Sequence, residues 1–408
     1  MYSRGSMRLF IRQAMPRNPR VLTVISYYSP HISGLSEYAR LVAENMVADG
    51  LDVTMLTARH RKDLPPNEVI AGVSVIRATP LMFLHKGYLS PDFIARYSDL
   101  CRRHDVVLLH LPMLESGLLA QLAPRAQPLA VVYHCDVTPS RNGSLFDRAA
   151  VAAVRASCRL CARRADRIVV SSMDYATGSE VLRGMERKMA EAYAPDKAPV
   201  GPLVRQPLAL PAGPARIGFL GRFAEEKGID ILLDAVPLVL ERLPNAKFLL
   251  AGDHGFVAGG SQYGLLREQL NGLKDNVEVL GRLSEEQLFP FYRSLDLFLL
   301  PSINSYEAFG MVQVEAMKSG VPVIATDLRG VRVPVQKTGN GCIVPPGNAR
   351  ALADAILSRI SRPAERSAEQ IAAKAWDVFR PENTLAVIAG LVRQMASANT
   401  APANSSKK

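Results

Sequence analysis

Residues 301–320 read PSINSYEAFGMVQVEAMKSG, and the apolar run VPVIAT follows directly. Two carboxylates, Glu307 and Glu315, stand eight positions apart in this stretch, with Gly310 between them. A helix that begins near Gly310 directs its first free N–H groups back toward Glu307, and the amide dipoles there favour an anion. Because glycine has no Cβ, a ligand can approach this backbone closely. The stretch therefore predicts a phosphate-binding helix start.

The second glutamate allows this site to bind hydroxyl groups in addition to a phosphate. Glu315 lies little more than one turn into the helix, where its carboxylate can accept hydrogen bonds from hydroxyls near the phosphate. Apolar runs at 297–300 and 321–325 predict buried strands on both sides, so the motif lies at strand ends, where open α/β sheets bind ligands. A phosphate with hydroxyls on both sides is a nucleotide-sugar. For an isolated glutamate pair, a helix cap and a solvated charge are the alternative.

The spaced glutamate pair resembles the signature of the GT4 family of retaining glycosyltransferases, in its C-terminal domain. The resemblance implies an α/β, GT-B fold, in which two Rossmann-like parallel-sheet domains face a central cleft. It implies that Glu307 holds hydroxyls of the transferred sugar and Glu315 the ribose of a nucleoside-diphosphate sugar. It also implies that Phe309, Gly310 and Met311 line the same donor site.

Two basic residues, Arg222 and Lys227, follow a strand predicted at 216–220, at the mouth of a strand-to-helix loop. Cationic side chains there can reach a diphosphate and neutralise charge that grows on it. An exposed Arg and Lys without a ligand are the alternative. Their placement resembles the family's Gly-Arg and Lys-Gly diphosphate clamp, which implies that both bind the donor and act in catalysis. Arg282, after a strand predicted at 277–281, corresponds to the region that holds the base.

The first half of the chain also alternates predicted strands and helices, which indicates a second parallel sheet. Gly34 lies in the loop after the first strand, and the resemblance implies that this loop closes over the donor diphosphate. His134 ends a strand predicted at 129–133 and therefore lies at the ligand edge of its sheet. A lone histidine can equally be structural. Residues 133–137 resemble a family strand end whose histidine lies beside the transferred sugar, so we expect His134 in the active site.

The sequence departs from the family pattern at two places. Ser33 stands where the first loop usually has the first of two adjacent glycines. Near 329–332 the family often has two glycines and a glutamate, whereas this chain has Arg329, Gly330 and Arg332. Both departures lie in loops that are expected at the cleft.

We predict five parts of the chain, separated at changes of composition. Six prolines between 194 and 214 indicate the linker and the hinge between two domains. The parts are a basic N-terminal extension at 1–20, an acceptor-side Rossmann-like domain at 21–205, a nucleotide-sugar donor-binding Rossmann-like domain at 206–380, a C-terminal helix that returns to the first domain at 381–396, and a disordered tail at 397–408.

Positive charge is concentrated in the first half of this 408-residue chain, whose formal net charge is +11. Residues 1–210 contain 27 Lys and Arg against 18 Asp and Glu, whereas the rest contains 22 against 20. Such asymmetry suggests a polyanionic partner, either nucleic acid or an anionic membrane surface. The segment 141–164 fits a basic amphipathic helix on that surface, or a helix with one face in the core and solvated arginines.

The remaining composition limits the compartment and the chemistry. No run of about 18 apolar residues predicts a membrane span, so we expect a cytoplasmic protein that is peripheral on the inner face of the plasma membrane. The five cysteines are too few and too scattered for a disulfide framework, and the single C-x-x-C at 158–161 has no second pair. Without an Asp-x-Asp motif for Mg²⁺, we expect no metal and no other cofactor.

Together these features predict a retaining, metal-independent hexosyltransferase. It would move a hexose from GDP-mannose or a UDP-hexose to a hydroxyl of a saccharide or lipid-linked saccharide. Residues 172–182 resemble bacterial mannosyl- and glucosyltransferases that extend lipid-linked saccharides, which implies cell-surface polysaccharide or lipopolysaccharide synthesis.

Three other functions compete with this prediction. A nucleotide-sugar epimerase could share the fold and would need no acceptor. A basic nucleic-acid-binding protein would explain the charge, but the sequence lacks aromatic-basic interleaving, so no nucleic acid is expected as a partner. A Rossmann dehydrogenase is disfavoured because no G-x-G-x-x-G follows the first strand.

Overall fold

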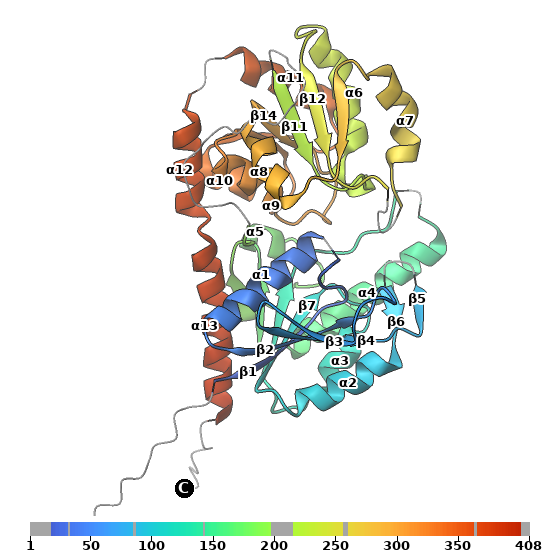
Figure 1. Cartoon of the computed structure of the whole chain (residues 1–408), viewed down its shortest axis with the longest axis vertical. Coiled ribbons are helices and arrows are strands. Elements are labelled where there is room, and N and C mark those ends of the chain that lie inside the picture. Colours follow the sequence, from blue (N-terminus) through green and yellow to red (C-terminus); the bar gives the residue numbers. More distant parts are fainter. Residues whose placement is uncertain are drawn as a thin grey trace, which may run out of the picture.

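The computed structural model describes residues 18–31, 33–84, 87–141, 143–196, 215–255, 260–362 and 365–400. Its strands form two separate parallel sheets, stacked one above the other along the long axis of the molecule (Figure 1). We call the part around the first sheet the first domain and the part around the second sheet the second domain. Most of the predicted linker and of the predicted extension at 1–20 lies outside the described residues.

The first sheet has the order β10-β9-β8-β7-β1-β2-β4-β3 and is parallel except for its edge strand β3. Its strands are β1 (Arg20–Val24), β2 (Asp52–Ala58), β3 (Asn67–Ile70), β4 (Val73–Ala78), β7 (Val106–Leu111), β8 (Leu129–Tyr133), β9 (Arg167–Val170) and β10 (Met189–Glu191), while β5 (Met82–Leu84) and β6 (Gly87–Leu89) form a separate hairpin. The helices of this domain are α1 (Gly34–Ala48), α2 (Pro91–Cys101), α3 (Ser116–Leu122), α4 (Leu145–Arg164), α5 (Met173–Ala176) and η1 (Glu186–Lys188).

The second sheet has the order β13-β12-β11-β14-β15-β16, and all of its strand pairs are parallel. Its strands are β11 (Arg216–Leu220), β12 (Lys247–Ala251), β13 (Val277–Gly281), β14 (Leu297–Leu300), β15 (Val323–Thr326) and β16 (Gly341–Val344). The helices are η2 (Glu225–Lys227), α6 (Ile229–Leu240), α7 (Tyr263–Gly272), α8 (Glu285–Arg293), α9 (Met311–Lys318), α10 (Val333–Thr338), α11 (Ala349–Ser361) and α12 (Ala368–Val378). Two facing parallel-sheet domains confirm the predicted GT-B architecture.

The central strands are largely apolar because helices cover both faces of each sheet, whereas the edge strands β3 and β13 are partly exposed. Successive side chains of a strand point to opposite faces, so Leu108 and Leu109 of β7 enter different hydrophobic clusters of the first domain. In the second domain, Leu249 and Leu250 of β12 are separated in the same way. Each domain therefore has a core on either side of its sheet.

The last helix, α13 (Pro381–Thr400), lies along the first domain beside α1 (Figure 1). Ile388 and Val392 are fully buried in a cluster with residues of β1, β2 and α1. We predicted a helix at 381–396 and a disordered tail at 397–408, and this is wrong for 397–400. The helix continues because Ala396 is buried and the Ser397 hydroxyl donates a hydrogen bond to the Arg393 carbonyl one turn earlier.

The basic helix α4 uses much of its charge to hold neighbouring loops. Arg155 donates to the Val137 carbonyl, and Arg159 and Arg164 donate to carbonyls of two other loops. These three arginines therefore match the packing alternative rather than a surface free for a partner. In contrast, Leu145 and Phe146 at the start of α4 are 84% and 76% exposed. Among the described helices, none combines the length and hydropathy that a membrane crossing requires.

Candidate functional site

Each sheet has one switch point, where strands that are distant in the sequence lie side by side. In the first sheet β1 lies between β2 and β7, and in the second β11 lies between β12 and β14. Ligands of open parallel sheets bind beyond the carboxyl ends of the strands at such points. Most of the predicted site residues lie in the loops that follow β1, β8, β11 and β14 or in helix α9, whereas Arg282 follows β13.

The loops after β11 and β14 meet through charged side chains. Lys227 Nζ lies 2.5 Å from Glu307 Oε2, and the Ser302 hydroxyl donates to the same oxygen at 3.3 Å. Arg222 donates to Glu226 on its own loop at 3.1 Å. The structure therefore brings together the cation and the carboxylate that the sequence predicted to face one ligand. Ser302 was missed, although it lies inside the motif.

Two glycines allow these loops to approach neighbouring atoms closely. Gly228 has φ +65°, and a Cβ there would lie 2.1 Å from the Pro301 carbonyl oxygen. Gly310, with φ +78°, is the N-cap of α9, and a Cβ there would lie 2.4 Å from a methyl group of Leu300. Positive φ and contact of this closeness both exclude larger residues. The start of α9 is thereby fixed directly after the Glu307 loop, as predicted.

The side chains around the start of α9 face the protein interior. Phe309 stacks on Tyr193 with ring centroids 5.7 Å apart and meets Phe379 edge-on. Gln313 Nε2 donates to the carbonyls of Phe309 and Val331, at 2.6 and 2.9 Å. Phe309 therefore presents only its backbone to a ligand, whereas the half-buried Met311 begins the helix.

Glu315 is buried and accepts a 2.8 Å hydrogen bond from the Tyr292 hydroxyl of α8. Burial, and next the Glu315 charge, raise the pKa of Tyr292 well above its ordinary value, so this hydroxyl remains a donor. One carboxylate oxygen is thus oriented by Tyr292. Sequence reasoning missed Tyr292, since it looks like any apolar-face residue of an amphipathic helix.

His134 follows β8 and pairs with a second histidine. His110 Nδ1 and His134 Nε2 are 2.9 Å apart, and the Tyr38 ring meets the His134 ring edge-on at 4.7 Å. Burial lowers the pKa of His134 to about 3 and also lowers that of His110. Both rings are therefore neutral at physiological pH. His110 lies within the buried run of β7, and its place near the end of that strand was the signal for it.

The two sides of the site approach each other. Burial raises the pKa of Cys135, the residue after His134, to about 12, and the Glu307 charge contributes to this rise. Tyr175 accepts a hydrogen bond from the Asp136 N–H and donates one to the Ser305 carbonyl of the second domain. His134 therefore belongs to a chain segment that contacts the Glu307 loop.

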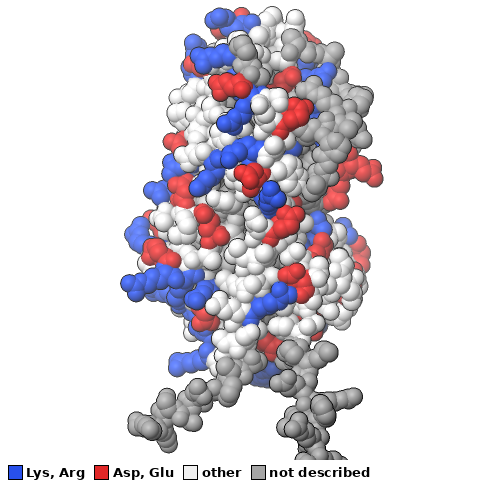
Figure 2. Space-filling model, turned by 90° about the vertical axis from the view of Figure 1, so that its left-hand side faces the viewer, with Lys and Arg blue, Asp and Glu red and all other residues white. Residues whose placement is uncertain are grey.

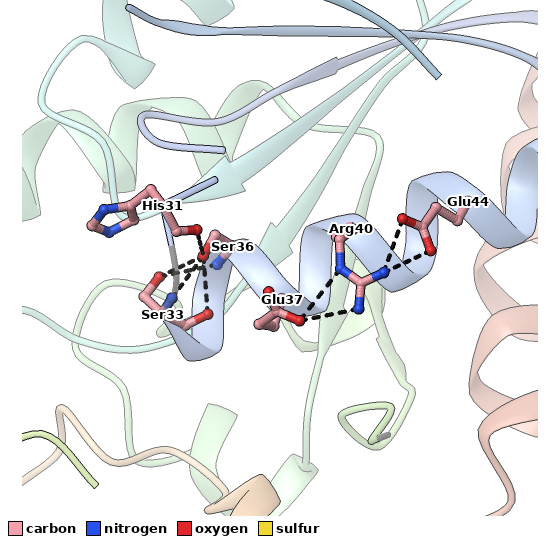
Figure 3. Close-up of polar contacts among 6 residues, drawn as sticks. All are labelled: His31, Ser33, Ser36, Glu37, Arg40 and Glu44. Atoms are coloured by element: carbon pink, nitrogen blue, oxygen red, sulfur yellow. Dashed lines mark hydrogen bonds and ion pairs between the residues drawn. The ribbon is translucent and has the colours of Figure 1, made fainter. Parts of the chain in front are cut away.

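The loop after β1 ends in a capping box (Figure 3). Ser33 Oγ accepts from the Ser36 N–H at 3.1 Å, and the Ser33 N–H donates to Ser36 Oγ at 2.8 Å. The Ser36 hydroxyl also donates to the His31 carbonyl. Two amides at the helix start are thus used internally. The N–H groups of Gly34 and Leu35 are the next ones that an anion could meet.

The two arginines that depart from the family pattern lie at the contact between the domains. Arg332 donates to both oxygens of Asp174 on α5, at 2.7 and 2.9 Å. Arg329 lies across Gly178, where a Cβ would be 2.3 Å from the arginine Cδ. A cavity of about 210 Å³ opens beside it, lined by Asp136, Tyr175, Gly178, Ser305, Leu328 and Arg329. Arg332 thus ties the domains together.

Arg282 is the predicted residue that lies furthest from this constellation in the sheet. It follows β13, an edge strand that is separated from β11 by β12, and its side chain is exposed. No hydrogen bond or ion pair of the described residues joins it to Lys227 or Glu307. It lies at the same carboxyl edge as the other loops.

Two family models cover most of the chain. Residues 33–191 match the model "Glycosyl transferase 4-like domain", and residues 214–362 match "Glycosyl transferases group 1". Phosphatidyl-myo-inositol mannosyltransferase of Mycobacterium leprae is 30% identical over 80% of this chain and 83% of its own length. D-inositol 3-phosphate glycosyltransferase of Nocardiopsis dassonvillei is 29% identical over 87% and 89%.

Solved structures share the fold at lower identity. Sucrose-phosphate synthase from Thermosynechococcus elongatus aligns with a TM-score of 0.76 and 22% identity, over 93% of this chain and all of that one. HepE from Anabaena, in complex with UDP and glucose, aligns with a TM-score of 0.68 and 20% identity over the same shares. At such identities the likeness concerns the arrangement of the two domains.

Proposed function

The chain belongs to the GT4-type glycosyltransferases, which have the GT-B fold, and on that premise we propose that it is a retaining, metal-independent hexosyltransferase. Its donor is a nucleoside-diphosphate hexose, either GDP-mannose or a UDP-hexose. Its acceptor is a hydroxyl of a saccharide or lipid-linked saccharide in cell-surface polysaccharide or lipopolysaccharide synthesis. The observation that carries the proposal is the contact of Lys227 with Glu307, which joins a diphosphate-binding loop to a sugar-binding one.

The negative charge that develops on the leaving group is the main contribution to the energy barrier that the protein must lower. When the bond between the anomeric carbon and the phosphate oxygen breaks, the diphosphate gains one negative charge. Fixed positive groups stabilise this state more than the intact donor and so raise the rate. In this proposal Arg222, Lys227 and the amide dipoles at the starts of α1 and α9 supply these positive groups.

The other predicted residues orient the donor in this proposal. Glu307 holds sugar hydroxyls, and Glu315, whose carboxylate accepts a hydrogen bond from Tyr292, holds the ribose. The neutral His134 ring lies beside the sugar and adds no positive charge there. Gly34 binds the diphosphate through its N–H, and Arg282 contributes near the base.

We propose that the acceptor hydroxyl attacks the anomeric carbon on the same face from which the diphosphate leaves, so that the anomeric configuration is retained. Glu307 as a covalent nucleophile is the second route, in which it would form and then lose a glycosyl ester. Its pairing with Lys227 and Ser302 lowers its readiness to attack. A 2-fluoro donor sugar distinguishes the routes, because only a covalent intermediate would add a sugar mass to the protein.

The direct test is a thermal-shift screen of UDP- and GDP-sugars, each with and without EDTA. A donor that binds only the folded chain at about 100 times its Kd adds about 2.7 kcal/mol to stability. We expect one base to stabilise the protein equally in EDTA, and transfer to follow when an acceptor is supplied. Absence of stabilisation by every donor would contradict the proposal.

Two alternatives give other outcomes in the same samples. An epimerase would release a different nucleotide-sugar without any acceptor. A nucleic-acid-binding protein would shift labelled DNA or RNA in a salt-dependent manner. Neither outcome is expected.

We also propose peripheral contact with an anionic membrane. Figure 2 shows both signs of charge interspersed over the face that carries α12 and α13, so this face offers no basic patch. The first domain has the excess of basic residues, and Leu145 and Phe146 are its most exposed large apolar side chains. Apolar side chains beside cations are what an anionic lipid surface binds.

Co-sedimentation with phosphatidylglycerol vesicles tests this contact. Binding at low salt should fall at high salt and in the double variant Leu145→Ser, Phe146→Ser. Leu265→Ser, at an equally exposed leucine of the second domain, is the matched control and should bind as the natural chain does. Absence of binding at low salt would remove the membrane proposal.

A further inference from the structure

A second group of side chains lies in the first domain at the carboxyl ends of the three adjacent strands β7, β1 and β2. Tyr27 and His31 follow β1, His60 follows β2, and Glu115 follows β7. All four are half-buried, so each of them keeps some surface that a ligand can contact. None of them is needed by the donor chemistry described above.

The aromatic members form a continuous wall. The Tyr27 ring lies 5.1 Å from the His31 ring and meets the His60 ring edge-on at 6.0 Å. The His31 and His60 rings also meet edge-on, at 5.6 Å. Tyr88 of β6, which is buried, supports Tyr27 from behind at 6.0 Å. Such edge and tilted contacts fix the rings in place.

A carboxylate stands beside this wall. Glu115 follows β7, the strand that pairs with β1, and its charge contributes to raising the pKa of Tyr27 and of Tyr88. Burial raises the pKa of Glu115 itself, because the group is poorly hydrated. A poorly hydrated carboxylate is a strong acceptor for hydroxyl donors.

The wall lies next to the proposed donor site. His31 lies in the loop that leads from β1 to Gly34, and the Arg222 charge, after burial and His60, contributes to lowering the pKa of His31 to about 4. The His31 carbonyl is held by the Ser36 hydroxyl of α1, and its ring points away from that helix (Figure 3). A molecule seated on the wall would therefore face the donor from the first-domain side.

We propose that Tyr27, His31, His60 and Glu115 form the acceptor subsite and that it binds an uncharged pyranose ring. The inference rests on the proposed transferase function and specifies the acceptor. The C–H face of a pyranose is apolar and packs on aromatic rings, while its hydroxyls donate to a carboxylate. A phosphorylated sugar would bring its charge toward Glu115, which disfavours it.

Saturation-transfer NMR tests the subsite without requiring turnover. The probes are the methyl α-glycosides of glucose, mannose, galactose and N-acetylglucosamine, with glucose 1-phosphate as the charged comparison. We expect one of the glycosides to bind and glucose 1-phosphate to bind at least tenfold more weakly. Because hydrogen bonds to charged groups and aromatic contacts are each worth about a factor of ten, Glu115→Gln and Tyr27→Ala should each raise the Kd by about tenfold.

Matched variants separate the subsite from general damage. Tyr27→Phe keeps the ring and should bind within about twofold of the natural chain, since the ring supplies most of the contact. Glu180→Gln, at an exposed glutamate of the same domain, should change nothing. Stabilisation by the nucleotide-sugar should be unchanged in Tyr27→Ala and Glu115→Gln. That readout tests the transferase proposal separately, so the two can fail independently.

Three results would overturn the subsite. They are binding of no glycoside in the set, equal glycoside affinity in Tyr27→Ala and the natural chain, and tighter binding of glucose 1-phosphate than of every neutral glycoside. The last result would indicate an acceptor that carries a phosphate.

Discussion

The two sides of the cleft are built in different ways. On the second-domain side, Lys227 and Glu307 are held by loops that pack closely at Gly228, against the Pro301 backbone, and at Gly310, against the Leu300 side chain. On the first-domain side, single side chains from separate loops, such as Tyr27 and Glu115, come together only through the order of the strands. A feature shared by many donors can be built into a rigid motif, whereas an acceptor surface built from single side chains can change one residue at a time.

The largest effect on the rate of transfer is expected from substitution of the charged residues of this rigid motif. Lys227→Ala should lower the rate of transfer by about 10²- to 10³-fold, because one fixed cation is lost from the leaving diphosphate. Glu307→Ala should be similarly inactive. Steady-state kinetics with the donor found by thermal shift checks both, with circular dichroism to confirm folding. Lys274→Ala, an exposed lysine of the same domain, is the control.

Near-normal rates in both Lys227→Ala and Glu307→Ala would contradict the donor assignment. If the variants changed only the KM for the acceptor, these residues would belong to the acceptor site instead of the donor site.

On the first-domain side, His134 should make the free energy of unfolding sensitive to acid. His134 has a pKa of about 3 in the folded chain and about 6.5 when unfolded. Between these values the unfolded chain binds a proton that the folded chain does not, so the free energy of unfolding falls as pH decreases. From pH 6.5 to 4.5 the loss from this residue is about 2 kcal/mol, and it becomes negligible above about pH 7.5.

Urea unfolding at pH 6.5 and 4.5 measures this loss. His134→Gln retains a partner for His110 but does not titrate, so its unfolding midpoint should fall less between the two pH values. The transfer rate of the natural chain should show no inflection from His134 between pH 5 and 8. An equal acid response in the variant would show that His134 is not held neutral.

Motif spacing predicted the helix start on the second-domain side because the residues that form it are close in the sequence. Gly310 as the start of a helix and Glu307 at its mouth follow from a single stretch. Lys227 lies 80 positions away, and its role was predicted from the resemblance to the family's diphosphate clamp. Tyr292 could not be predicted, since its contact with Glu315 depends on how α8 packs on α9.

Fewer residues and contacts of the first-domain side could be predicted from the sequence. His134 was placed by its strand end, but His110 looks like one more buried position of β7. Tyr27 and His60 lie 33 positions apart, and only the adjacency of β1 and β2 brings their rings together. At the C-terminus, α12 was not predicted, because its buried face consists of only Ile371 and small alanines. Local periodicity determines elements; it does not determine their partners.

Glycine substitutions test by protein stability whether the second-domain motif is rigidly packed. Gly310→Ala should lower the free energy of unfolding by about 2 kcal/mol, because it adds both an unfavourable positive φ and a clash with Leu300. Gly272→Ala, at the end of α7, meets no atom within 4 Å and has no positive φ, so it should be nearly neutral. Thermal unfolding compares the two. Equal behaviour would show that the start of α9 is not rigidly packed.

The smallest effect concerns Ser33, where the first-domain loop departs from the family's paired glycines. Ser33→Gly removes the side-chain cap of α1 but keeps a residue that tolerates an N-cap, which costs only a few tenths of a kcal/mol. It also deletes Ser33 Oγ, the acceptor for the Ser36 N–H, and frees that amide for the donor diphosphate. Donor affinity should therefore stay equal or rise slightly, by thermal shift with the nucleotide-sugar. Ser284→Gly, in the capping box of α8, is the matched control and should lose similar stability without changing donor affinity. A large loss of donor affinity in Ser33→Gly alone would mean that the serine hydroxyl itself binds the diphosphate, so that this loop contributes a specific side chain, as the rest of the first-domain side does.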